Sequence, residues 1–164
     1  MVRKIYFRCL KTLIYALVFV SGLCVFLMIG IICADVVLRR FSHPIKGAYD
    51  IVKIAGAVTL ASALPYTTAV KGHVAIEYFF HKLNRTGRVV VDSVVRLLGI
   101  GLFAFLSWRS FIYGLELRRS GQVAQTLEVL PIFWVPWIIA FCCLVVILVI
   151  VYNMIHPGRE MIKP

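Results

Sequence analysis

Few side chains in this chain of 164 residues could do chemistry, so their positions decide what chemistry is open to it. Its seven carboxylates are Asp35, Asp50, Glu77, Asp92, Glu116, Glu128 and Glu160. A carboxylate deep inside a long apolar segment would mark a path for protons, ions or substrate, because a charge there is costly. Each of the seven lies in a polar stretch or near the end of an apolar run. The carboxylates therefore disfavour an ion-coupled carrier that works alone.

Histidines and cysteines could ligate a haem or form a redox pair. The histidines are His43, His73, His81 and His156, and all lie in polar stretches or at the ends of apolar runs. A membrane haem needs histidines on facing helices at membrane depth. The five cysteines include no C-x-x-C spacing, so neither a zinc site nor a redox pair is indicated. We therefore expect no catalytic residue, metal site, cofactor or enzyme activity.

The basic residues raise two questions, one about Arg109 and one about the net charge. Arg109 lies within an apolar stretch, and three explanations stay open: it reaches back to the membrane surface, it pairs with Glu116, or it contacts a partner subunit. A substrate site is disfavoured, because no second polar group converges on Arg109 in this chain. The formal net charge is +11, from 18 Lys and Arg against 7 Asp and Glu. These cations are scattered between apolar runs, which favours lipid headgroups over nucleic acid as their partner.

The elements that carry these residues follow from the apolar runs. Hydrophobic residues make up 62% of the chain, against about 45–50% in an ordinary soluble domain, so lipid is the expected solvent. We predict an all-α integral membrane protein with one domain, 1–164, and four transmembrane helices. Their predicted ranges are about 12–34, 48–70, 88–115 and 132–153, each long enough for a hydrocarbon core of about 30 Å. The first run is too long for the apolar part of a cleaved signal, which spans about 7–15 residues.

The segment 74–83 differs from the four spans. Its apolar residues between Ile76 and Leu83 recur at positions i, i+3, i+4 and i+7, while the polar Glu77 and His81 lie mostly on the other side. This spacing predicts an amphipathic helix in the membrane interface, and packing against neighbouring protein is compatible with it. Of the 18 Lys and Arg residues, 11 lie on the side of this segment and both termini. The bias predicts that this side, with the amphipathic helix, faces the cytoplasm.

Around the first predicted loop, the sequence has a recognisable order of residues. Arg39 and Arg40 end the first predicted helix, and Pro44, Gly47 and Asp50 lead into the second. Proline and glycine are typical of a turn between two helices. An acidic residue in the first turn of a helix is favourable because it lies at the positive end of the helix dipole.

Two further features complete the pattern. Gly72 and His73, followed by Glu77, close the second predicted helix, and Thr126 and Pro131 lead into the fourth. In this order, over about residues 13–152, the chain resembles the small permease subunit of tripartite ATP-independent periplasmic (TRAP) transporters, the DctQ-like family. Asp50 stands where that family usually has Glu, and Gly72 directly precedes His73 where the family has Gly-x-His.

The resemblance implies a small, multi-pass subunit of the bacterial inner (cytoplasmic) membrane, in a sodium-coupled secondary transporter that imports organic acids such as dicarboxylates or sialic acid. The implied partners are a large TRAP permease subunit, for which this chain is a scaffold, a periplasmic solute-binding protein, and membrane lipids. The outer loops, about 39–47 and 116–130, would lie near the binding protein. The cations available to steer an acidic surface there are Arg39, Arg40, Arg118 and Arg119.

Two other functions stay open at this point. One is a self-sufficient, homo-oligomeric carrier, and the other is a membrane anchor for a redox enzyme. The positions of the carboxylates and histidines count against both, because neither group lies in the middle of a predicted span.

Overall fold

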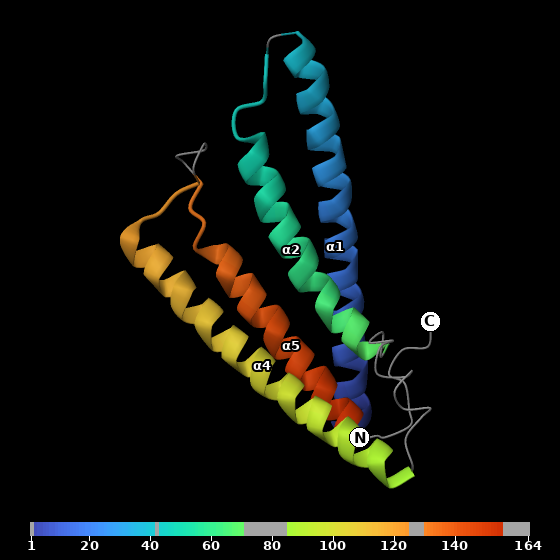
Figure 1. Cartoon of the computed structure of the whole chain (residues 1–164). Helices are drawn as coiled ribbons and strands as arrows, with labels where there is room; N and C mark the ends of the chain where they lie inside the picture. The colour runs from blue at the N-terminus through green and yellow to red at the C-terminus, as the bar shows by residue number, and fades with distance from the viewer. Residues whose placement is uncertain (1, 42, 71–84, 125–129, 156–164) are drawn as a thin grey trace.

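Four α-helices account for most of the chain in the computed structural model, which describes residues 2–41, 43–70, 85–124 and 130–155 (Figure 1). They are α1 (Val2–Arg40), α2 (Ala48–Ala69), α4 (Arg85–Ser120) and α5 (Trp134–Ile155). Each contains a segment long and apolar enough to cross a membrane. The predicted all-α membrane protein with four transmembrane helices is therefore confirmed. The amphipathic helix predicted at 74–83 lies outside the described residues.

Helices α1 and α4 extend beyond the predicted ranges. α1 continues to Arg40, past the predicted end near residue 34, and α4 runs from Arg85 to Ser120, beyond 88–115. The prediction followed uncharged runs, which mark the hydrocarbon core, whereas a helix continues into the polar headgroup region on charged residues. α2 ends at Ala69 and α5 begins at Trp134, close to the predicted 70 and 132.

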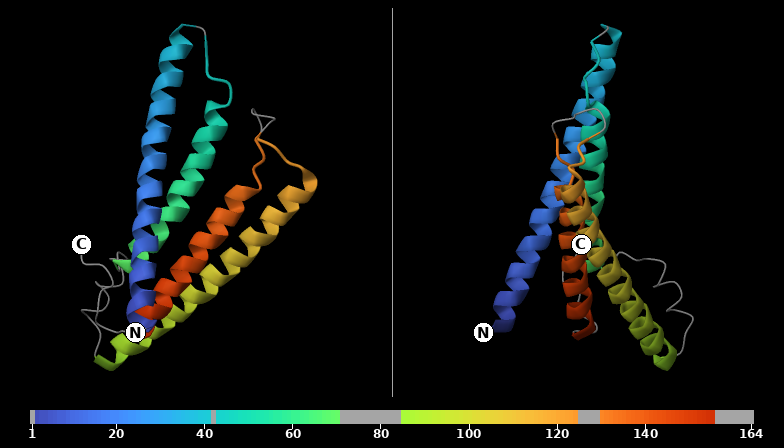
Figure 2. Two further views of the ribbon diagram at one scale, coloured as in Figure 1. Left: turned by 180° about the vertical axis from the view of Figure 1, so that it is seen from behind. Right: turned by 90° about the vertical axis from the view of Figure 1, so that its left-hand side faces the viewer.

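The helices form two antiparallel hairpins that lie side by side. α1 packs on α2, α4 packs on α5, and the contact of α2 with α5 joins the hairpins, so the order across the molecule is α1, α2, α5, α4 (Figure 1). The hairpins lie close together where α1 and α4 begin, which we call the terminal end (Figure 2). They lie further apart where α1 and α4 end, which we call the loop end.

Burial follows this order. In the membrane-crossing segments, 50% of the α5 residues and 33% of the α2 residues are buried, against 6% in α1 and in α4. The outer helices expose large apolar side chains, such as Phe26 of α1 and Trp108 of α4. Lipid tails are as apolar as these side chains, so their exposure carries no penalty in a membrane. The core therefore lies along α2 and α5, and at the terminal end Leu10 and Ile14 of α1 join it, packed with Ala69, Val145 and Val149.

Hydroxyl groups tie neighbouring helices together. The Ser21 hydroxyl of α1 donates to the Thr59 carbonyl of α2 at 3.2 Å, and the Ser107 hydroxyl of α4 donates to the Ala140 carbonyl of α5 at 3.1 Å. Such bonds between membrane helices are worth about 0.6–2 kcal/mol each, and serine is small enough to let the helices approach. Each hairpin thus has a serine hydroxyl bonded between its own two helices.

A second set of polar contacts links the hairpins at the terminal end. Arg96 of α4 donates through its guanidinium to the Asn153 carbonyl of α5, and the Asn153 amide donates to the Thr68 carbonyl of α2 at 3.4 Å. The sequence suggests an ion pair between Asp92 and Arg96, but the Asp92 side chain lies outside the described part of the chain. Asn153 is buried and bridges α4 to α2.

The loop end of the α4–α5 hairpin is packed around Trp137. Its ring stacks on Phe111 at a centroid distance of 6.3 Å and meets the edge of Phe133 at 5.5 Å. Gly114 lies against the same indole, and a Cβ atom there would overlap with it. The glycine therefore allows α4 and α5 to approach at this point.

We predict that Gly114→Ala destabilises the protein by about 1–3 kcal/mol, because Phe111 and Phe133 leave the Trp137 ring no free space to enter. Reversible unfolding in mixed micelles, followed by tryptophan fluorescence, measures the change. Gly101→Ala is the control, since it lies on the same helix with no atom within 4 Å of the added Cβ. Equal unfolding free energies for the two variants would contradict the packing described here.

Candidate functional site

Asp35 organises the loop end of the α1–α2 hairpin. Although it lies in the last turns of α1, it is only 7% exposed. One carboxylate oxygen accepts a hydrogen bond from Arg39 Nε at 2.8 Å, and the other accepts one from the backbone N–H of Ile45 at 2.9 Å. The first bond lies within α1 and the second crosses the loop. One carboxylate therefore fixes both the end of α1 and the path of the chain away from it.

The turn into α2 depends on Gly47. Its φ of 86° lies in the left-handed region, where a side chain would be strained, and its carbonyl accepts the Ile51 N–H at 3.1 Å. Pro44 precedes it on the surface, and Asp50 follows it, buried in the first turn of α2. Of the residues that the sequence singled out around this loop, Arg39 is the one bonded to Asp35, and Gly47 shapes the turn that follows.

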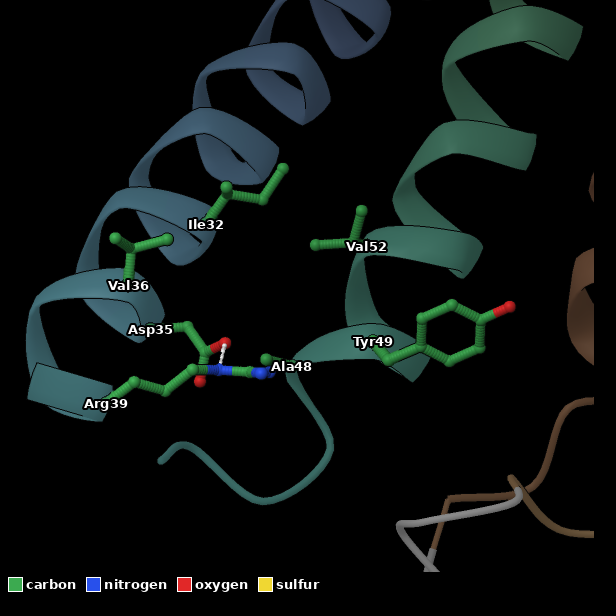
Figure 3. A pocket seen from close by; sticks show the side chains of 7 residues that line it. All are labelled: Ile32, Asp35, Val36, Arg39, Ala48, Tyr49 and Val52. Carbon is green, nitrogen blue, oxygen red and sulfur yellow. Dashed lines mark hydrogen bonds and ion pairs between the residues drawn. The ribbon is translucent and has the colours of Figure 1, made fainter. Parts of the chain in front are cut away.

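A pocket of about 190 Å³ lies between α1 and α2 beside this junction (Figure 3). It is lined by Ile32, Asp35, Val36, Arg39, Ala48, Tyr49 and Val52. Asp35 is the carboxylate of this pocket, and both of its oxygens are already bonded within the chain. The carboxylate of this pocket therefore holds the last turns of α1 to the loop that leads into α2.

The second loop end carries a basic residue held against an aromatic cluster. The Arg118 guanidinium lies 6.0 Å from the Trp137 ring centroid, within the range of a cation–π contact. The loop beyond α4 is closed by the Ala124 N–H donating to the Leu130 carbonyl at 3.0 Å, next to the pairing of Val123 with Pro131. Pro131 therefore lies in a short two-stranded bridge just before α5.

The described surface of the loop end is mainly cationic. Its exposed basic residues are Arg39, Arg40, Lys46, Arg118 and Arg119. The two acidic residues near the α1–α2 loop, Asp35 and Asp50, are buried, whereas Glu116 on α4 is exposed. The four arginines that the sequence singled out lie in the last turns of α1 and α4. The ends of these two helices are the tips of separate hairpins (Figure 2).

Arg109 is exposed on α4, and within the described residues it forms no ion pair with Glu116. Of the three explanations that the sequence leaves open for it, pairing with Glu116 is therefore wrong in this structure. Contact with the membrane surface and contact with a partner subunit remain. Gly72, His73 and Glu77 lie outside the described residues.

Sequence reasoning did not single out Asp35 as the residue that ties this loop together. Its spacing from Arg39 indicates the ion pair, because residues four apart on a helix face each other. Nothing in the sequence identifies the Ile45 N–H as the second partner. In the described part of the chain, no three His, Cys, Asp or Glu side chains come together as metal ligands.

Comparison with known protein families gives one match. The family model described as "Tripartite ATP-independent periplasmic transporters, DctQ component" matches residues 28–159, from the middle of α1 to beyond α5. Neither a curated protein nor a solved structure matches the chain.

We predict that Asp35→Ala destabilises the α1–α2 hairpin by about 1–3 kcal/mol, because it leaves the Ile45 N–H without its acceptor. Asp35→Asn keeps an acceptor for that N–H and is expected to cost less. Unfolding in mixed micelles measures both.

Arg39→Gln is the control for this prediction. It removes the ion pair but spares the bond to Ile45, and the Arg39 side chain is 69% exposed, so its expected cost is at most about 1 kcal/mol. A cost for Arg39→Gln as large as that of Asp35→Ala would show that the bond across the loop contributes nothing.

Proposed function

Because the chain belongs to the DctQ component family of tripartite ATP-independent periplasmic transporters, we propose that it is the fixed scaffold on which a large permease subunit imports organic acids with sodium. The family is that of the small transmembrane subunit of such transporters, which work with a large permease and a solute-binding protein. The proposal adds the scaffold role, the sodium coupling, the bacterial inner membrane and the class of substrate, such as dicarboxylates or sialic acid.

The position of the acidic residues carries this proposal. On the described helices they are Asp35, Asp50, Asp92 and Glu116, and each lies within about two turns of a helix end. Moving an ion or an organic anion through hydrocarbon needs polar groups at the depth of the midplane. This arrangement supports a division of labour in which the partner subunit carries substrate and sodium.

The orientation of the chain is part of the proposal. Lys and Arg are more numerous on the side of the terminal end, which favours the cytoplasm for that side. The loop end then faces the periplasm, where the solute-binding protein docks. The exposed arginines at both tips supply a positive potential that attracts an acidic protein surface.

Reconstitution tests the scaffold role. Vesicles that hold this chain together with its large permease are expected to accumulate a labelled dicarboxylate or sialic acid when a sodium gradient and the binding protein are present. Vesicles that hold either membrane subunit alone are expected to show no uptake above empty vesicles. Accumulation by this chain alone would overturn the proposal, and so would full uptake by the permease without it.

Charge reversal tests the docking role of the loop end. We expect Arg40→Glu combined with Arg119→Glu to lower the initial uptake rate on the order of tenfold at low ionic strength, and less at high ionic strength, because salt screens exposed charges. Arg118 is kept because it packs on Trp137.

The charge-retaining pair Arg40→Lys with Arg119→Lys is the control for this experiment and is expected to keep the rate of the unchanged chain. An uptake rate at low ionic strength that charge reversal leaves unaltered would remove the steering role of these arginines.

A further inference from the structure

Arg109 lies on the face of α4 that points away from the rest of the chain. Ser107 and Gly114 are buried against α5. Arg109 follows Ser107 by two residues, which is about 200° around a helix of 3.6 residues per turn. Its neighbours on that face, Phe105 and Tyr113, are 65% and 55% exposed. The guanidinium therefore sits in a stripe of large apolar side chains that nothing in the described chain covers.

The depth of Arg109 follows from the register of α4 against α5. The Ser107 hydroxyl bonds to the Ala140 carbonyl, and Gly114 lies against Trp137. Arg109 lies two residues nearer the loop end than Ser107 and is therefore roughly level with Ile138, which lies four residues, or about 6 Å, inside the start of α5 at Trp134. Tryptophan typically marks the membrane interface. Arg109 also lies inside the segment Ser93–Ser120 of α4 that is long and apolar enough to cross a membrane, which puts it just inside the hydrocarbon core, closer to the loop end than to the terminal end.

The direction of the Arg109 side chain disfavours contact with the lipid headgroups at the loop end, which is the nearer membrane surface. In an α-helix every Cα–Cβ bond tilts toward the helix N-terminus. α4 begins at the terminal end, so the Arg109 side chain starts out toward the middle of the membrane and away from the loop end. Reaching headgroups at the loop end would require the chain of methylenes to turn back. A partner protein at the same membrane depth can pair with the guanidinium without any such bend of the Arg109 side chain.

Arg96 on the same helix shows the contrast. It lies near the opposite end of α4, and its guanidinium is bonded to the Asn153 carbonyl. Arg109 has no such partner among the described residues. A charge in hydrocarbon is normally kept only where it pairs with another group or faces a protein surface. The missing counter-charge must come from outside the described chain.

We propose that the face of α4 formed by Leu102, Phe105, Arg109 and Tyr113 is where a transmembrane helix of the large permease packs, and that this helix supplies a carboxylate to Arg109. The inference deepens the scaffold proposal and rests on it.

A second copy of this chain fits the same face poorly. Two parallel copies related by an axis along the membrane normal place identical residues at identical depth, so Arg109 would oppose Arg109. Like charges at hydrocarbon depth repel strongly, because the low dielectric screens them little. Charge complementarity therefore selects a different chain with an acidic residue.

Association between the two subunits tests the contact directly. Fluorescent proteins fused to this chain and to the permease report their affinity in vesicles by energy transfer at increasing lipid dilution. Arg109→Leu is expected to weaken association about 30-fold or more, because it leaves the permease carboxylate buried without a counter-charge. Arg109→Lys keeps the charge, and its affinity for the permease is expected to lie between that of the unchanged chain and that of Arg109→Leu. Lys53→Leu, which removes an exposed cation from α2, is the control and is expected to leave the affinity unchanged.

A separate measurement excludes misfolding as the cause. The chain alone should unfold no more easily after Arg109→Leu, because the change removes a charge from a lipid-exposed face. A photo-reactive residue at position 105 should then cross-link to the permease in the assembled complex.

The outcomes separate this contact from the scaffold proposal. If the unchanged subunits associate and Arg109→Leu associates equally well, the contact is refuted and the scaffold role stands. Cross-links from position 105 to lipid alone or to a second copy also refute the contact. If the unchanged subunits do not associate at all, the scaffold role fails, and this inference fails with it.

Discussion

The contact between α2 and α5 joins the two hairpins, and the position of every other surface depends on it. Lipid gives helices no hydrophobic reason to associate, so the contact relies on close approach and on polar bonds. Ser62 of α2 and Cys142 of α5 are small, adjacent and almost completely buried. At the terminal end the Asn153 amide reaches the Thr68 carbonyl. Small side chains let these helices approach, and the Asn153 amide adds a polar bond between them at the terminal end.

This central contact leaves α1 and α4 on the outside, each with one face free. Large apolar side chains on a free face do not reveal whether lipid or protein covers it, because both are apolar. Phe26 on α1 and Leu102 on α4 are therefore uninformative by themselves. A charge does discriminate, since lipid tails cannot pair with it. That is why Arg109, rather than any larger side chain, distinguishes the outer face of α4 from the outer face of α1.

The sequence predicts the helices well because a membrane span leaves a signal in every turn. It predicts the polar contacts only where they are local, as in the Asp35–Arg39 pair four residues apart. Glu116 lies seven residues from Arg109, about 10 Å along the helix, so both side chains would have to bend toward each other. The bonds from Asp35 to Ile45 and from Arg96 to Asn153 depend on how the chain folds back, which no periodicity records. The candidate docking face likewise required the register of α4 against α5.

The two ends of the molecule are held in different ways, and the difference bears on a scaffold role. At the loop end each hairpin is fixed by its own contacts, with Asp35 binding the first loop and Trp137 packing the second. At the terminal end Asn153 links α4, α5 and α2 into one unit. A scaffold must keep its shape while its partner moves. Here the hairpins are linked at the terminal end, and the loop of each hairpin is fixed by its own contacts, which meets that requirement. Each tip can then hold its own part of a partner's surface without depending on the other tip for its order.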